Sequence, residues 1–270
     1  MSKIVDKERF YYNPGFLGSP QGRSVRILSE YYGPLQRLQR KKIADTIVFF
    51  GSARTLSRED AQTALDNAPK KADEQTIKRL KSDLKMSRYY EDARILAGKF
   101  TTWSKGLKGT KRRYIICSGG GSGIMEASNR GAAEAGGINV GLTISLPFES
   151  SGNEWITDDL DMKFHYFFMR KFWFLYLAKA LIVWPGGFGT LDELMECLTL
   201  IQTQKIKKRL PIVLYGKEFW GNVVNWDYLV EAGTISPKDL KLFHISDDVE
   251  DTYKYVTDFI EKYQLKGPNF

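Results

Sequence analysis

The carboxylate of Glu193 is the side chain in this sequence that is best placed to do chemistry. It stands in PGGFGTLDELME, three residues after Thr190, and residues at that spacing share one face of a helix. Thr190 closes a glycine turn, so we expect Glu193 to face the same site, whereas Asp192 is rotated away by about 100°. A carboxylate at a helix start can be only a cap or a dipole partner. Beside a bound phosphate ester it can also bind a sugar hydroxyl or activate water.

Two cations, Arg170 and Lys171, stand in the aromatic segment FHYFFMRKFWF. Burying a cation in such surroundings is costly unless an anion accompanies it. A substrate phosphate or Glu193 could be that anion; alternatively, both side chains extend to water. We expect the surrounding aromatic side chains to belong to the core rather than to a base-stacking surface. They are Phe164, Tyr166, Phe167, Phe168 and Phe172.

Two glycine-rich turns predict an anion site. SGGGSG supplies Gly119, Gly120, Gly121, Ser122 and Gly123, and PGGFGT supplies Gly186, Gly187, Gly189 and Thr190. Each turn follows a predicted strand and precedes a predicted helix, where exposed N–H groups and the positive end of the helix dipole favour a phosphate. Because parallel strands end at one edge of a sheet, both turns can face one site. The alternative is that these glycines only permit tight turns.

Other common sites are not indicated. A GxGxxG pattern read from Gly119 fails at Ile124, and no GxxxxGK[ST] occurs, so a dinucleotide fingerprint is weakly supported and a P-loop is excluded. Two cysteines, Cys117 and Cys197, cannot form a disulfide scaffold or a cysteine zinc site, and we expect both to be small buried residues. His165 and His244 show no partner in the sequence and receive no role. We therefore expect no metal and no cofactor.

Short apolar runs alternate with helical segments along the chain. Strands are predicted at residues 47–50, 114–117, 139–145, 180–184 and 211–215. Helices are predicted at 24–40, 91–103 and 250–263, after each glycine turn, and in the second half of 163–179, whereas 147–162 is predicted to be a polar loop. This alternation is typical of a parallel sheet covered on both faces. The predicted fold class is α/β, a doubly wound parallel sheet with helices on both faces.

Positive charge is concentrated at the start of the chain. Residues 1–42 carry nine Lys or Arg and three acids, which is +6 of the total net charge of +8. We therefore divide the chain into a basic N-terminal extension, 1–42, and a single domain, 43–270, with a helical insertion near 56–87. The extension is either a solvated arm or interface helix, or an arm that binds phosphate or RNA. Of these, nucleic-acid binding is the less expected.

No segment of the sequence predicts a membrane anchor or a leader. The longest apolar stretch, 172–184, is interrupted by Lys179 and is shorter than the about 20 residues of a membrane span. The first residues, MSKIVDKERFYYNPG, contain no apolar signal region. We expect a cytoplasmic protein without a membrane partner.

These residues together resemble the LOG (Lonely Guy) family, whose members are often labelled lysine decarboxylases. The family signature is PGGxGTxxE preceded by an RK pair. The matching residues here are Pro185, Gly186, Gly187, Gly189, Thr190, Glu193, Arg170 and Lys171. The family's GGGxxGxM element resembles Gly119, Gly120, Gly121, Gly123 and Met125, one position tighter, and its FGS turn resembles Phe50, Gly51 and Ser52. The resemblance spans residues 45–215.

The resemblance implies a Rossmann-like α/β domain that forms a homodimer or a higher homo-oligomer. It implies a phosphoribohydrolase that cleaves a nucleoside 5′-monophosphate, AMP-like or a cytokinin riboside 5′-monophosphate, into free base and ribose 5-phosphate. Arg170 and Glu193 match the family's catalytic pair. The implied phosphate and substrate site comprises Gly51, Ser52, Gly119, Gly120, Gly121, Ser122, Gly123, Met125, Lys171, Gly186, Gly187, Gly189 and Thr190.

The alternative function is a non-catalytic carrier of a phosphorylated ligand. Molybdenum cofactor carrier proteins share this fold and similar glycine turns. Plant LOG enzymes carry Met-His-x ahead of the RK pair, where this chain has Phe167, Phe168 and Met169, and the extension and insertion resemble the longer bacterial members. For hydrolysis, a second acid could come from Glu154, Asp158 or Asp159, and Asn153 could contact ribose or base.

Overall fold

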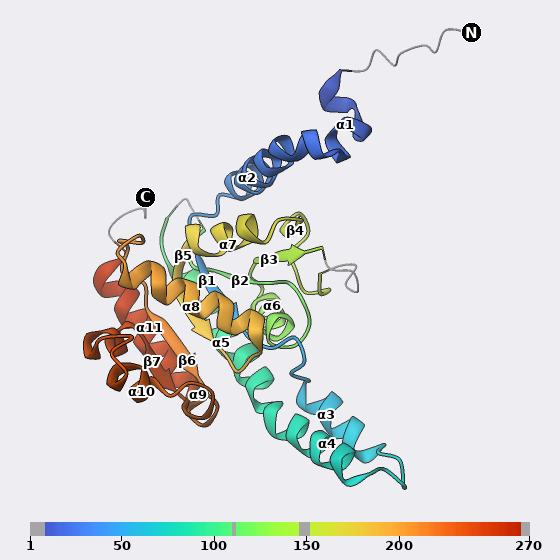
Figure 1. Ribbon diagram of the computed structural model, residues 1–270, viewed down its shortest axis with the longest axis vertical. Helices are drawn as coiled ribbons and strands as arrows, with labels where there is room; N and C mark the ends of the chain where they lie inside the picture. Colours follow the sequence, from blue (N-terminus) through green and yellow to red (C-terminus); the bar gives the residue numbers. More distant parts are fainter. Residues whose placement is uncertain (1–8, 110–111, 146–151, 266–270) are drawn as a thin grey trace.

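A seven-stranded, fully parallel sheet forms the centre of the molecule (Figure 1). The computed structural model describes residues 9–109, 112–145 and 152–265. The strands are β1 (Thr46–Phe50), β2 (Ile115–Ser118), β3 (Asn139–Ile144), β4 (Asp161–Phe164), β5 (Ala178–Val183), β6 (Ile212–Tyr215) and β7 (His244–Ser246). Their order is β4-β3-β2-β1-β5-β6-β7. The chain therefore winds outward from β1 in both directions, which confirms the doubly wound α/β fold.

Helices cover both faces of the sheet. On one face lie α5 (Arg88–Gly106), α6 (Ile124–Glu134) and α11 (Val249–Tyr263), and on the other lie α7 (Phe167–Tyr176) and α8 (Phe188–Gln202). The central strand feeds both cores, because Ile47 and Phe49 point to one and Val48 and Phe50 to the other. Strands buried on both faces read as continuous apolar runs, and the five predicted strands are confirmed as β1, β2, β3, β5 and β6.

Two helical parts extend from this body in Figure 1. The amino-terminal part comprises η1 (Phe10–Tyr12), α1 (Pro14–Gly18), η2 (Pro20–Gly22) and α2 (Arg23–Arg40); the other is the pair α3 (Arg58–Asp66) and α4 (Glu74–Met86). Shorter helices α9 (Lys217–Val223), α10 (Trp226–Glu231) and η3 (Pro237–Leu242) connect β6 to β7. The division into an extension, 1–42, and a domain, 43–270, stays a prediction. None of the helices in the described ranges is long and apolar enough to cross a membrane.

Strand β4 lies inside the segment predicted to be a loop. Its burial alternates, with Asp161 and Lys163 exposed and Met162 and Phe164 buried, a pattern of period two that is easily lost in polar surroundings. Residues 147–151 of the predicted loop lie outside the described residues. Helix α7 begins at Phe167, so it occupies more of 163–179 than the second half.

The prediction that the aromatic side chains around Arg170 belong to the core is wrong for three of them. Phe164 and Tyr166 are buried, but Phe167, Phe168 and Phe172 are exposed. Only the inward face of α7 packs against the sheet, through Met169, Trp173 and Phe174 among others. The reason is that a helix on an open sheet buries one stripe, which composition alone does not locate.

The remaining thiol and imidazole groups have structural surroundings. Cys117 and Cys197 are free and buried, as expected, and burial raises the pKa of each thiol to about 12. The Nε2 of His244 lies 2.8 Å from Asp251 Oδ2, a partner that the sequence alone does not show. The pair is seven residues apart in sequence and joins the end strand to α11.

Lys179 is a buried ammonium at an irregularity of the central sheet. Thr46 pairs with Ala178 and Ile47 with Ala180, so Lys179 is the extra residue between them. Its side chain is 1% exposed, and its Nζ has no hydrogen-bond partner within the described residues. Burial lowers the pKa of Lys179 to about 8. Between pH 8 and 10.5 the unfolded chain therefore retains a proton that the folded chain has lost, and stability rises with pH over this window.

We predict that Lys179→Met raises the free energy of unfolding at pH 7 by about 1–3 kcal/mol, because it removes a buried charge and keeps the length of the side chain. The gain should shrink as the pH approaches 10.5. Denaturant unfolding at several pH values measures it, with the exposed Lys78→Met on α4 as the control. A loss of stability in Lys179→Met at pH 7 would contradict the prediction.

Candidate active site

The candidate site lies where the carboxyl ends of β1, β2 and β5 meet. Backbone hydrogen bonds tie the three following turns together: Ser52 N donates to Pro185 O and Ile124 N donates to Ser52 O, each at 3.0 Å. Ser122 Oγ adds a bond to Ala53 O at 2.8 Å. Beside them opens a cavity of about 620 Å³, a size suited to a small-molecule ligand. Its place beside β1 and β5, where the winding direction reverses, is where open α/β sheets bind ligands.

The first glycine turn, after β2, packs closely against Arg170 and Met125. Gly120 and Gly123 have φ of +72° and +65°, a region that side chains rarely adopt. A Cβ on Gly119 would lie 2.5 Å from Arg170 Nη2 and 2.7 Å from Met125 Sδ. This turn therefore needs glycine for close packing as well as for its backbone conformation.

The side chain of Asn153 is hydrogen-bonded to the first glycine turn. Its Nδ2 donates to Gly120 O at 3.1 Å, to Gly121 O at 2.9 Å and to Asn129 Oδ1 at 3.0 Å. Ser118 Oγ in turn donates to Asn129 Oδ1 and accepts from Gly120 N. The side-chain amide nitrogen of Asn153 is thus bonded to the turn. This differs from the expectation that Asn153 contacts ribose or base.

The second glycine turn presents the start of α8 to the cavity. Gly187 is the N-cap residue, and its carbonyl accepts from the N–H groups of Thr190 and Leu191. The first N–H groups of a helix have no carbonyl partner within it, so Phe188 and Gly189 expose donors beside the positive end of the helix dipole. Gly187, Phe188 and Gly189 are all exposed and line the cavity. The arrangement suits a phosphate group.

Glu193 is buried in the cavity wall, one turn into α8. Glu193 is 9% exposed, and this burial is the main reason that its pKa is raised to about 7. Lys171 and Arg170 oppose this rise, and Glu196 and Asp192 reinforce it. Lys171 Nζ lies 2.8 Å from Asp192, 2.6 Å from Glu196 and 3.8 Å from Glu193. A carboxyl group with a pKa near neutrality can both stabilise positive charge and accept a proton.

Arg170 is held at the opposite wall. Its Nε donates to Leu142 O at 2.7 Å and its Nη2 donates to Gly119 O at 3.3 Å. The guanidinium carbon lies 5.1 Å from the centre of the Phe174 ring, a favourable cation–π distance. The cation thus has fixed partners at the end of β3 and in the first glycine turn, and it faces the same cavity as Glu193.

The cavity brings together most of the residues singled out in the sequence. Lining it are Gly51, Ser52, Gly119, Gly120, Gly121, Met125, Arg170, Gly187, Gly189, Thr190 and Glu193. Ser122, Gly123, Lys171 and Gly186 are not among the lining residues, although Ser122 bonds to Ala53 and Lys171 lies near Glu193. Glu154, Asp158 and Asp159 are not among the lining residues. The functional roles of all these residues stay predictions.

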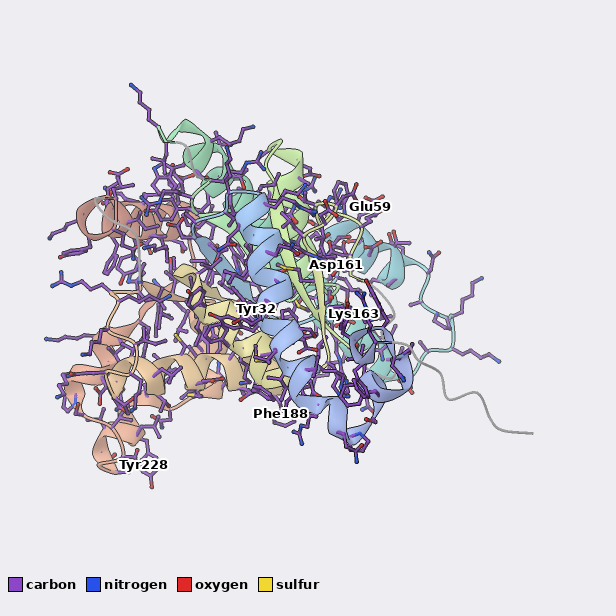
Figure 2. All side chains as sticks on the ribbon, turned by 90° about the horizontal axis from the view of Figure 1, so that it is seen from above. Tyr32, Glu59, Asp161, Lys163, Phe188 and Tyr228 are labelled. Atoms are coloured by element: carbon purple, nitrogen blue, oxygen red, sulfur yellow. The ribbon has the colours of Figure 1, made fainter. Side chains whose placement is uncertain are left out.

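Sequence reasoning missed several residues of the cavity mouth. Arg54, Lys163, Phe167 and Phe188 line it, and Phe167 and Phe188 are 52% and 93% exposed. Arg54 lies two residues after the FGS turn and Phe188 fills the variable position of PGGxGT, so the neighbouring motif residues pointed to both of them. Lys163 had none, because β4 was not predicted. In the view of Figure 2, α2 crosses the molecule between Lys163 and Phe188.

We predict that Glu193→Gln stabilises the protein above pH 7. Between pH 4.5 and 7 the folded chain retains a proton that the unfolded chain has lost, so the contribution of Glu193 to stability falls as the pH rises through this window. Glutamine does not ionise, and the variant should gain about 1–3 kcal/mol at pH 8 and almost nothing near pH 4.5. Thermal melts at both pH values, with the exposed Glu231→Gln as control, measure the effect. Equal stability of variant and wild type at pH 8 would show that burial does not make the ionised form of Glu193 unfavourable.

Comparison with known proteins gives a family match and several similar solved structures. No curated protein sequence matches the chain. The X-ray structure of a protein designated TM1055 has 19% identity and a TM-score of 0.45, covering 79% of this chain and 99% of its own. Two structures of the molybdenum cofactor carrier protein from Chlamydomonas reinhardtii have 16% and 18% identity and TM-scores of 0.41 and 0.44, covering 80% and 81% of this chain and 99% of their own. Residues 125–256 match the family model described as "Possible lysine decarboxylase". The matched residues contain Arg170, Lys171 and the turn before Glu193, and the resemblance drawn from the motifs of the chain is confirmed.

Proposed function

We propose that the protein hydrolyses the N-glycosidic bond of a nucleoside 5′-monophosphate, AMP-like or a cytokinin riboside 5′-monophosphate, to free base and ribose 5-phosphate. The observation that carries the proposal is a buried carboxyl group with a pKa of about 7, Glu193, in the same cavity as two glycine turns at helix starts. Helix starts suit the 5′-phosphate, and such a carboxylate suits the charge that develops on a ribose ring.

The reaction needs little beyond positioning and electrostatic stabilisation. As the bond between base and C1′ lengthens, positive charge grows on the ribose, as in other glycoside hydrolyses. The Glu193 carboxylate stabilises this charge and takes a proton from the attacking water, whose oxygen joins C1′. The departing base receives a proton from solvent or from the protonated Glu193. Arg170 binds the phosphate or keeps Glu193 ionised. Preorganised charges of this kind usually make the largest contribution to the rate acceleration at such sites.

The exposed aromatic side chains at the mouth support a planar substrate group. Phe167 begins α7 and Phe188 begins α8, and both line the cavity while remaining largely exposed. Large exposed aromatic side chains beside a ligand cavity favour a flat, apolar partner. A nucleobase fits this requirement. The homo-oligomeric state and the cytoplasmic location stay predictions.

Lysine decarboxylation is supported less well. A lysine that forms a Schiff base needs a lowered pKa. Lys171 lies 3.8 Å from Glu193, but bonds to Asp192 and Glu196 raise the pKa of Lys171 above its ordinary value. Its ammonium group is therefore kept charged and serves the charge balance around Glu193.

We predict release of free base from at least one of AMP, GMP, CMP, UMP and isopentenyl-AMP, measured by chromatography in the presence of EDTA. Glu193→Ala should lower the rate by about 10²–10³-fold or more, because the positive charge on ribose loses its carboxylate. Glu193→Gln, expected to fold at least as stably as the wild type, separates loss of chemistry from loss of fold. No release from any nucleotide would contradict the proposal and favour a carrier of a phosphorylated ligand, to be identified among co-purifying compounds.

We predict that kcat/KM falls as the pH drops below about 7, because the ionised form of Glu193 is required. Lys171→Met should move this acid limb to higher pH, because Lys171 lowers the pKa of Glu193. Lys205→Met, an exposed lysine beyond the end of α8, should leave the limb in place. An unchanged limb in Lys171→Met would show that the titrating group is not Glu193.

A further inference from the structure

Helix α7 carries Arg170 and Lys171 but does not cap itself. Its N-cap residue, Tyr166, makes no side-chain capping bond, and its first turn contains no acid. Glu30 of α2 instead binds the two residues that lead into the helix. One carboxylate oxygen accepts from the N–H of His165 at 2.7 Å and the other from the N–H of Tyr166 at 3.2 Å. A carboxylate at this end of a helix is stabilised by the helix dipole and by charge-assisted bonds.

Glu30 also holds α7 at a second point. Its backbone carbonyl accepts from Trp173 Nε1 at 2.9 Å, in the second turn of α7. The ring of Tyr31 lies beside those of Phe172 and Trp173, with centroids 5.7 and 5.8 Å apart. Helices α2 and α7 accordingly lie side by side in Figures 1 and 2. Contacts at two turns fix the position of α7 along its axis and its rotation about that axis.

Tyr166 connects this cap to Arg170. Its N–H donates to Glu30, and its carbonyl accepts from Arg170 N at 3.2 Å. The Arg170 side chain then reaches Leu142 O and Gly119 O. The fit is close, since even a Cβ on Gly119 would lie 2.5 Å from Arg170 Nη2. A small shift of α7 would therefore change the guanidinium contacts.

We propose that Glu30 is a positioning residue of the active site, which fixes α7 so that the Arg170 guanidinium lies against Gly119 in the cavity wall. The kinetic part of this proposal rests on the proposed function. Another cation of the extension also contacts the body, since Arg37 Nη1 donates to Asp161 O at 3.1 Å. The extension thus holds α7 in place beside the site. This favours the prediction that the extension is an interface helix over the prediction that it is an arm that binds RNA.

The charges around Glu193 give this role a distinctive signature. Arg170 and Lys171 face Glu193 from α7, Asp192 and Glu196 come from its own helix, and Arg54 and Lys163 line the same cavity. Glu30 orders only the α7 pair. Both members of that pair lower the pKa of Glu193. Displacing α7 should raise that pKa, which a general loss of stability would not do.

The test compares Glu30→Ala, Glu30→Gln and the control Arg40→Ala, which breaks an exposed ion pair at the far end of α2. Glu30→Ala should lower kcat by about 10- to 100-fold and move the acid limb of kcat/KM to higher pH. Glu30→Gln keeps one acceptor oxygen and should lie between it and the wild type. Arg40→Ala should behave as the wild type. In an Arg170→Ala background, Glu30→Ala should lower kcat by a much smaller factor than in the wild type, because the guanidinium that Glu30 positions is absent.

A readout without turnover separates this proposal from the proposed function. Arg170 Nε–H is hydrogen-bonded to Leu142 O and should give a distinct ¹⁵N–¹H resonance, assigned by its absence in Arg170→Lys. Glu30→Ala should broaden or remove it, and Arg40→Ala should retain it. If the wild type releases no base but this pattern holds, the proposed function fails and the positioning role stands. A resonance unchanged in Glu30→Ala, or equal fold losses with and without Arg170, would overturn the role of Glu30.

Discussion

The turns that follow β1, β2 and β5 are bonded to one another through Ser52, and the glycine turns of the proposed site take their positions from those bonds. Ser52 N reaches Pro185 O, and Ser52 O receives Ile124 N, so the backbone of a single residue joins both glycine turns. The parallel sheet makes this possible, because it brings the carboxyl ends of strands distant in sequence to one edge. Helix starts follow at once, and their unpaired N–H groups face the same space. A phosphate-sized anion requires just this concentration of donors, and Glu193 and Arg170 are placed around it.

Within this frame, catalysis and stability make opposite demands on the same side chains. Burial moves the pKa of Glu193 to about 7, where the carboxylate becomes useful, and makes its ionised form unfavourable for folding. Lys171 limits the penalty through its contacts with three acids of α8. Lys179, by contrast, is buried with no hydrogen-bond partner for its Nζ in the described part of the chain.

The sequence predicted those parts of the molecule whose structure is indicated by residues close together in the chain. The inner strands read as apolar runs because both of their faces are covered, and the spacing of Thr190 and Glu193 correctly predicted a shared, buried face of α8. It could not predict β4, whose four residues alternate within a polar segment, or the exposure of Phe167, which depends on where α7 sits on the sheet. The pKa of Glu193 and the bonds of Glu30 depend on residues far away in the chain, so no local pattern contains them.

The contacts of Glu30 also set an order of events during synthesis. Its partners His165 and Trp173 follow it by 135 and 143 residues, and contacts of such separation close slowly because a long loop must be ordered first. A growing chain emerges amino end first, so α2 leaves the ribosome with its acceptor oxygens and apolar residues uncovered. They meet their partners only after four further strands of the sheet have been made. Helix α2 is thus translated well before the helix on which it docks, and a nascent chain that stops before residue 173 has neither a fixed arm nor a complete cavity.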